Sequence, residues 1–484
     1  MAIKFLVQKF FSGGIASSKK IGVRGSFALA QRANIFDEAT EVTINPTSVK
    51  VSGTTVTDLI KWIVSGNPYD TNTYFYSSGG KLYKETSGGT WSAVGTLSTA
   101  SGQGADLYSD YIYFTKNAAM ARYGPLSGSP SLTDPWTTAT GINTTSDYAP
   151  VKAFAAGGLA VGHGNYLGWW DGAVWDNDRL VFPPGHNVRS LDVIDEFLVI
   201  GTWRGTSITA NEEGALWFWD GTSQYPNFFV NINEGGVAAV LNNKNRLITS
   251  IGGSGVLMQN YRPFQKINTV PLLTIGKYVE VLPGAMTNWR GMAHIGIGGN
   301  TDSADIYQGV YTFGNSREEF PEALNYGYTI STGTAQSTTL KIGALKGIGN
   351  NLYIAWRDGD TYGVDKVTNS GSPFASAVIE SLIFDNDDSG RDKLALKLKA
   401  THLPLASGES VQLGYKVNRA SSYTTGTVNS TVDSTETELP IPSSAARFRE
   451  FQWEAVLATT GSTSPTLTSV TLQFDDLAKE LGGF

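Results

Sequence analysis

The sequence predicts an all-β protein: a β-propeller of about seven blades, with six or eight as alternatives, followed by an antiparallel β-sandwich. Three observations lead to this prediction. Glycine is abundant (55 of 484 residues), while aromatic residues make up 11% and charged residues only 16%, which is typical of sheets joined by many turns. Short apolar bursts recur through residues 40–380. After residue 380 they give way to longer strands with alternating polarity.

Residues 1–39 are predicted to form an extended, basic N-terminal arm. No acidic residue precedes Asp37, whereas six basic residues do: Lys4, Lys9, Lys19, Lys20, Arg24 and Arg32. The composition leaves two alternatives open. The arm is either flexible and solvated, or it orders against an acidic neighbouring subunit by strand addition or charge pairing.

Residues 40–380 carry the pattern that predicts the propeller. Each burst is a polar turn followed by an apolar strand, and the bursts centre on Leu82, Ile112, Leu159, Leu198, Leu247, Ile295 and Leu352. The six intervals between the first and the last average 45 residues. Repeats of roughly 40 to 50 residues built only from short strands are typical of four-stranded propeller blades. Seven bursts therefore predict about seven blades.

Residues 381–476 predict the β-sandwich, and a short polar tail covers residues 477–484. The boundary is the charged turn "FDNDDSGRD" at 384–392. Asp385, Asp387 and Ser389 resemble the start of a calcium loop. The twelfth position of that loop would be Leu396 rather than a glutamate, which favours a solvated turn.

Tryptophans cluster with Asp-Gly pairs in "GNYLGWWDGAVWDNDRL" (164–180) and "LWFWDGTS" (216–223). The aspartates that precede glycine, Asp171 and Asp220, are predicted to form hairpin turns rather than to act as catalytic acids. The tryptophans either pack between blades or contact a partner or a glycan; the candidates are Trp169, Trp170, Trp203 and Trp219. Because neighbours on a strand face opposite sides, we expect one of Trp169 and Trp170 to pack between blades, and the sequence leaves open whether the other is exposed.

No motif indicates an enzyme. The four histidines lack the spacing of paired zinc ligands, cysteine is absent, and no nucleophile elbow or nucleotide-binding loop occurs in a suitable setting. We therefore expect no catalytic residue, no cofactor and no metal. The net charge of -7 argues against sequence-specific nucleic-acid binding. The N-terminal residues do not form a convincing signal peptide, and no apolar stretch is long enough to insert into a membrane.

The order of these segments resembles structural tail proteins of tailed bacteriophages. The resemblance rests on the Gly/Ser-rich N-terminal segment, on residues 24–63 ("RGSFALAQRANIFDEATEVTINPTSVKVSGTTVTDLIKWI"), on the phrases "GGKLYK" and "FWDG", and on the C-terminal sandwich. It implies a minor tail, tail-nozzle, tail-tip or baseplate protein that forms a ring-like homo-oligomer, contacts other tail proteins and is assembled in the host cytoplasm. A receptor- or glycan-binding tail protein is the alternative, and a glycan-degrading enzyme is less favoured.

Overall fold

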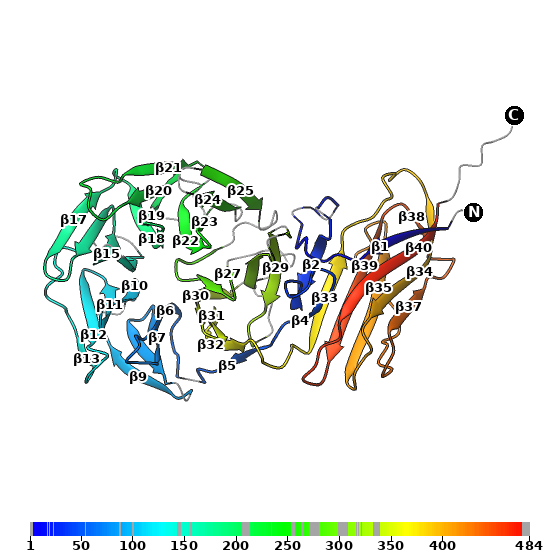
Figure 1. Ribbon diagram of the computed structural model, residues 1–484, viewed down its shortest axis with the longest axis horizontal. Coiled ribbons are helices and arrows are strands. Elements are labelled where there is room, and N and C mark those ends of the chain that lie inside the picture. The colour runs from blue at the N-terminus through cyan, green and yellow to red at the C-terminus, as the bar shows by residue number, and fades with distance from the viewer. Residues whose placement is uncertain are drawn as a thin grey trace. The chain divides into compact units, whose positions relative to one another are not determined.

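The computed structural model describes residues 3–476, with these gaps: 17, 19, 23, 54, 87–88, 99–100, 143–146, 155–156, 206–212, 234, 253–256, 263–264, 272–279, 299–307, 316, 318, 321 and 333–338. For residues 257–262 and 265–271 only the backbone is described. All regular secondary structure in the described residues is β-strand, which confirms the predicted all-β class (Figure 1). The predicted tail, 477–484, lies outside the described residues.

The chain folds into two compact units. Unit 1 contains residues 1–48, 311–328 and 368–484, and unit 2 contains residues 49–310 and 329–367. These limits differ from the predicted boundaries at residues 39/40 and 380/381. The reason lies in strand pairing: β2 (Phe27–Gln31) pairs with β29 (Ala323–Tyr328) and with β33 (Ser376–Ser381), so that three distant stretches of chain share one sheet.

Unit 2 contains small antiparallel sheets that follow one another along the chain. Five of them consist of four consecutive strands each. They are β6 (Ile60–Ser65), β7 (Thr73–Ser77), β8 (Lys81–Glu85) and β9 (Trp91–Thr96); β10 (Gly104–Tyr108), β11 (Tyr111–Lys116), β12 (Ala119–Gly124) and β13 (Ser131–Thr133); β14 (Val151–Phe154), β15 (Gly158–His163), β16 (Tyr166–Trp170) and β17 (Trp175–Val181); β18 (His186–Ile194), β19 (Phe197–Arg204), β20 (Gly214–Trp219) and β21 (Phe228–Ile232); and β22 (Val237–Asn243), β23 (Arg246–Ile251), β24 (Leu257–Arg262) and β25 (Gln265–Pro271).

Two further groups of strands complete the series. One starts with β26 (Met286–Trp289) and β27 (Met292–Ile297), and the strand order continues with β28 (Gly309–Gly314) and β29. The other contains β30 (Lys341–Ile348), β31 (Asn351–Asp358) and β32 (Thr361–Thr368), and its fourth strand is β5 (Ser48–Lys50), which precedes β6 in the chain. The last group of unit 2 is therefore completed by a segment from its beginning.

The seven predicted bursts fall in seven different groups of strands. Six lie on the second strand of their group, from Ile112 on β11 to Leu352 on β31, whereas Leu82 lies on the third strand, β8. This difference explains the short interval of 30 residues between Leu82 and Ile112. The first strands of the groups also contact one another in succession, in the order β6, β10, β14, β18, β22, β26 and β30, and β30 contacts β6 again.

The polar turn before Leu247 forms a tight hairpin. Between β22 and β23, Asn243 pairs with Arg246, and the two residues between them, Lys244 and Asn245, have φ values of 52° and 58°. Two left-handed residues are what a two-residue hairpin needs if its twist is to match that of the strands. The apolar residues that follow such turns are buried between neighbouring sheets.

Unit 1 contains two sheets. In one, the strand order is β1 (Ile3–Gln8), β40 (Leu467–Asp475), β34 (Lys393–His402) and β37 (Glu436–Pro440), with β38 (Arg447–Phe448) also paired to β34. In the other, β29, β2 and β33 are followed by β39 (Phe451–Thr459), β35 (Glu409–Val417) and β36 (Thr424–Thr425). The short strands β3 (Ala33–Asn34) and β4 (Thr43–Ile44) pair with each other.

The long strands of unit 1 alternate as the sequence predicts. Leu398 on β34 and Val470 and Leu472 on β40 are buried, whereas their sequence neighbours are partly exposed. Among the described residues, no helix is present that could span a membrane.

Candidate functional sites

The four candidate tryptophans are buried. Trp219 and Trp203 are 0% and 3% exposed, and Trp169 and Trp170 are each 9% exposed. A buried ring cannot present its face to a sugar. These four side chains therefore do not form a stacking platform, and the alternative of packing between sheets describes them.

Trp169 and Trp170 point to opposite faces of β16, as alternation requires. Trp169 meets Trp219 edge-on at a centroid distance of 5.2 Å, in the cluster shared with β18–β21. Trp170 meets Trp136 edge-on at 5.2 Å, in the cluster shared with β10–β13. Both rings are therefore buried, and the exposure that the sequence left open for one of them does not occur, because neighbouring sheets cover both faces of this one.

Asp171 and Asp220 form turns, as predicted from the glycine that follows each of them. The Asp171 carboxylate accepts hydrogen bonds from the backbone N–H groups of Ala173 and Val174. These hydrogen bonds, both to Oδ1, lower the pKa of Asp171, so they favour the ionised carboxylate in its turn.

Asp220 is held still more firmly. Burial opposes ionisation of its carboxyl group, but hydrogen bonds from Ser223, Asn227 and Thr222 outweigh that effect and keep the pKa of Asp220 well below its usual range. A general acid needs a pKa near the working pH. Neither aspartate has the environment that such a role requires.

The histidines have structural partners. His163 and His402 are buried and form hydrogen bonds with backbone carbonyl groups, at 2.9 Å in both cases. His294 is buried and lies 3.3 Å from the Met292 carbonyl oxygen, while His186 lies 3.2 Å from the Thr202 hydroxyl. Among the described residues, no group of three potential metal ligands comes together.

Two basic residues of the predicted arm form ion pairs within unit 1. Lys4, on β1, lies 2.6 Å from Asp476. Lys20 lies 2.8 Å from Asp385 and 3.2 Å from Glu450, so the turn compared with a calcium loop is instead held by a lysine. The acidic partners of these lysines are thus supplied by the same chain.

The other basic residues of the arm differ from one another. The Arg24 guanidinium lies over the Phe10 ring at 4.0 Å and that of Arg32 over the Phe374 ring at 5.1 Å. Lys9 is exposed, and Lys19 lies outside the described residues. That the arm contacts a neighbouring subunit stays a prediction.

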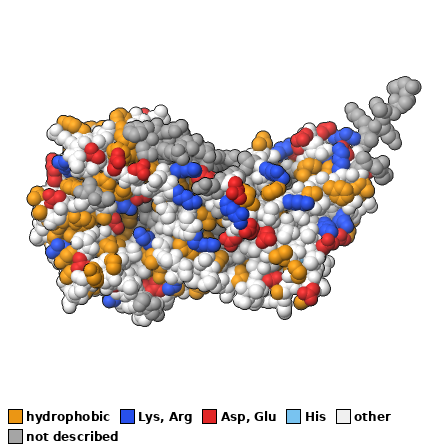
Figure 2. Space-filling view, in the orientation of Figure 1, with side chains coloured by type: hydrophobic (Ala, Val, Ile, Leu, Met, Phe, Trp, Pro, Cys, Tyr) orange, Lys and Arg blue, Asp and Glu red, His pale blue; other side chains and the backbone are white. Residues whose placement is uncertain are grey.

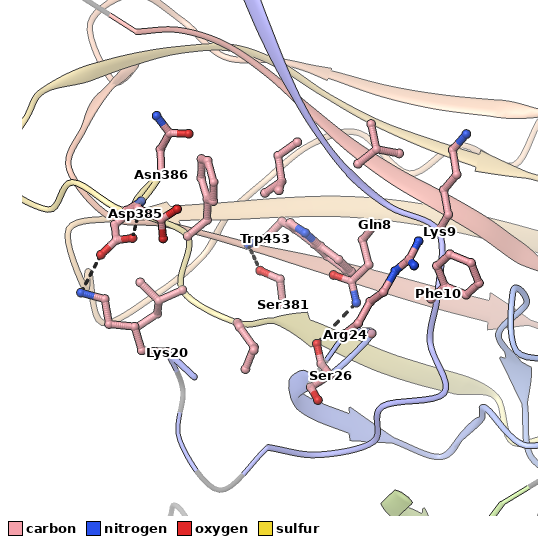
Figure 3. A pocket seen from close by; sticks show the side chains of 17 residues that line it. Gln8, Lys9, Phe10, Lys20, Arg24, Ser26, Ser381, Asp385, Asn386 and Trp453 are labelled. Carbon is pink, nitrogen blue, oxygen red and sulfur yellow. Dashed lines mark hydrogen bonds and ion pairs between the residues drawn. The ribbon is translucent and has the colours of Figure 1, made fainter. Parts of the chain in front are cut away.

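The arm also borders a cavity of about 460 Å³ in unit 1 (Figure 3). It is lined on one side by the end of β1 and by Arg24, and on the other by residues 381–387 and Trp453. Figure 3 shows the Ser381 hydroxyl accepting a hydrogen bond from the backbone of Trp453, while Gln8 reaches the Ser26 carbonyl. The lining is an apolar floor with charged groups at its edge.

The edge strand β1 carries a row of exposed apolar side chains on one of its faces, which the sequence analysis did not predict. β1 is antiparallel to β40 and ends the strand order of its sheet. Ile3, Phe5 and Val7 alternate along it and are 53%, 63% and 42% exposed. The alternation of apolar residues in "IKFLVQ" could have predicted this row. The basic residues of the arm drew attention to charge instead.

Charged residues elsewhere on unit 1 are mostly paired. Lys397 with Glu438 and Lys399 with Glu436 form ion pairs across β34 and β37. On the face drawn in Figure 2, several blue side chains likewise lie beside red ones. Such exposed ion pairs contribute little to stability, but they prevent a strong electrostatic potential of one sign from forming over this surface.

A cavity of about 400 Å³ in unit 2 is lined by residues from all seven first strands. Its charged residues are Asp106, Lys152, Asp192 and Lys346. Lys152 lies 2.8 Å from Asp192, whose charge raises the pKa of Lys152, while burial lowers the pKa of Lys346. Two lysines and two aspartates balance one another here, so this cavity favours neither sign of ligand.

Comparison with known proteins gives no family. No family model matches this chain, and no curated protein matches it. Similar solved structures include an extracellular domain from B. thetaiotaomicron, at 11% identity over 75% of this chain and 44% of that one, with a TM-score of 0.45. They also include a chain of the mitotic checkpoint complex (13% identity, 67% of this chain and 92% of that one, TM-score 0.45) and Raptor from Chaetomium thermophilum (11%, 70%, 30% and 0.46). This chain thus spans less than half the length of the first of these.

Proposed function

We propose that this chain is a structural subunit of a bacteriophage tail, located in the nozzle, tip or baseplate, and that it works as a ring-like homo-oligomer rather than as an enzyme. The proposal combines a stiff β-sheet body with a sheet edge suited to assembly. Its assignment to a virion tail, and to assembly in the host cytoplasm beside other tail proteins, depends on the resemblance seen in the sequence.

The body is, in this proposal, a seven-bladed β-propeller followed by a β-sandwich. Seven successive groups of antiparallel strands, first strands that contact one another in order, and the contact between β30 and β6 support the propeller. The use of β5 as the fourth strand beside β32 supports closure of the ring by an N-terminal segment. The two sheets of unit 1, with alternating burial, support the sandwich.

The observation that carries the assembly role is the edge strand β1. An open strand edge can pair with a further strand, and natural proteins usually protect such edges with charges, prolines or covering loops. Here the edge carries Ile3, Phe5 and Val7 on its exposed face. A second copy of the chain, adding a strand or packing an apolar surface on this row, is the occupant that a closed ring would supply.

The oligomeric state tests this proposal. The purified protein should form a discrete oligomer by light scattering at micromolar concentration, and Phe5→Glu should shift it towards monomer because a carboxylate would have to be buried in the interface. Val432→Glu is the matched control. Val432 is also an exposed apolar residue of unit 1, at 52%, but it is not part of the row on β1. It should leave the oligomer intact.

A wild-type protein that remains monomeric would overturn the proposal, and so would a Phe5→Glu variant that assembles normally. If a monomer bound host polysaccharide, the receptor-binding alternative would replace the structural role. Mass spectrometry of purified phage particles that carry this gene should find the chain at a symmetric copy number.

A further inference from the structure

A second cavity in unit 2, of about 390 Å³, has an excess of positive charge. Its lining comes from the first strands β6, β18 and β30, from β31 and β32, and from residues that precede or follow strands. Four cations line it: Lys61 on β6, Arg189 on β18, Lys341 on β30 and Arg357 on β31. The two acidic residues of the lining are Asp147 and Glu280. The side chains of this cavity therefore carry two positive charges more than negative ones.

Only one of the four cations forms an ion pair in the described part of the chain. Lys341 lies 3.0 Å from Glu280, whose side chain is 13% exposed. Arg357 donates from Nε to the Gly359 carbonyl oxygen at 2.7 Å, which leaves its charge uncompensated. The remaining two cations, Lys61 and Arg189, are held against aromatic rings.

The Arg189 guanidinium lies 4.6 Å from the ring centroid of Tyr148 and 4.6 Å from that of Trp203. Its Nε atom is buried and has no hydrogen-bond partner among the described residues. Aromatic faces hold the plane of a guanidinium in place but do not accept its N–H groups in strong hydrogen bonds. Arg189 is therefore pre-positioned and short of an acceptor.

Lys61 is likewise held against an aromatic ring, and it forms no ion pair among the described residues. Its ammonium group contacts the Asp147 carbonyl oxygen at 3.4 Å and lies 4.5 Å from the centroid of the Tyr148 ring. Burial lowers the pKa of Lys61; the charge of Asp147 opposes this effect and that of Arg189 adds to it. A buried cation next to another cation is unfavourable unless an anion joins them.

From this arrangement we propose that the cavity between Lys61, Arg189, Lys341 and Arg357 is a binding site for a small molecule that carries a carboxylate or phosphate group. The oxyanion supplies an acceptor for the Arg189 Nε–H group and compensates the charges of Lys61 and Arg357, and the planar guanidinium suits two-point contact with either group. The volume lies in the range of small-molecule sites. The balanced cavity lined by Lys152 and Asp192 does not share this preference.

Titration calorimetry with glucuronate and with inorganic phosphate tests the site, using the full-length protein at low salt. At least one of the two should bind, and the stronger of them identifies the anionic group. Lys61→Met should weaken binding about tenfold or more, because it removes a cation that contacts the anion. Lys244→Asn is the matched control: it removes one positive charge from an exposed turn of unit 2, where asparagine tolerates the left-handed backbone.

A gain of affinity gives the sharper test. Glu280→Gln removes a competing carboxylate and releases Lys341, so it should tighten anion binding about threefold to tenfold. Misfolding cannot produce that result. The proposal is overturned if neither anion binds, if the anion binds equally well to wild type and to Lys61→Met, or if Glu280→Gln leaves the affinity unchanged.

Discussion

Replacing Trp219 with alanine tests whether the tryptophan-rich segment is core or binding surface. Trp219 is fully buried, its indole Nε1–H donates to the Ser223 carbonyl oxygen at 2.8 Å, and its ring meets Trp169 edge-on. Truncating a buried tryptophan to alanine costs about 3 to 5 kcal/mol. The orphaned carbonyl group places the expected value near the upper end of that range, at about 4 to 5 kcal/mol.

That loss is a large part of the stability of an ordinary domain, which is about 5 to 15 kcal/mol. Urea unfolding followed by circular dichroism should therefore show a much lower midpoint for Trp219→Ala. Val174→Ala, at a residue that is 64% exposed in the hairpin of the neighbouring sheet, should change the free energy of unfolding by less than about 0.5 kcal/mol. A Trp219→Ala variant that loses under about 1 kcal/mol, or that keeps its fold but loses glycan binding, would refute this reasoning.

Three further predictions concern unit 2. Burial lowers the pKa of His294 from 6.5 to about 4. The free energy of unfolding should therefore keep the full contribution of neutral His294 above pH 6.5 and lose about 3 kcal/mol at most as the pH falls towards 4. His294→Gln should lack this part of the pH dependence when urea midpoints are compared at about pH 7.5 and about pH 4.5. Asp220→Ala should destabilise the protein by about 1 to 2 kcal/mol by removing five hydrogen bonds of its turn, and equal thermal stability of variant and wild type would contradict this. A methyl group on Gly158 would lie 2.1 Å from the Trp169 ring, so Gly158→Ala should cost about 2 kcal/mol or more in urea unfolding, whereas Gly128→Ala, with its nearest neighbour at 3.6 Å, should be almost neutral.

Features that depend on local sequence could be predicted. The all-β class and the hairpin aspartates follow from alternation and from the residues that tolerate positive φ, and both are present in the structure. The exposure of Trp169 and Trp170 could not be predicted in the same way. Alternation gives the face of the strand to which a ring points, but what covers that face is decided by a neighbouring sheet. Here Trp136 lies 34 residues before Trp170 and Trp219 lies 50 after Trp169.

The limits of the two units show the same dependence on distant pairing. A change of polarity near residue 380 is visible in the sequence, and the long strands after it are real. That residues 1–48 and 311–328 belong with them is not visible, because it depends on β1 pairing with β40 and on β2 lying between β29 and β33. The basic residues of the first 39 positions suggested an acidic partner, and for Lys4 and Lys20 that partner is supplied by the same chain.

The cavity lined by Lys61, Arg189, Lys341 and Arg357 shows why a search for short sequence motifs does not find a site of this kind. Lys61, Arg189 and Lys341 are separated by more than a hundred residues in each step, so no spacing within a motif connects them. Each nevertheless lies on the first strand of its group, and these first strands contact one another in succession. Residues on the first strands of different groups therefore meet in space. Such a cluster could be found in the sequence alone by aligning the groups of strands on their first strands instead of reading along the chain. In that alignment, residues that line the same cavity stand near one another.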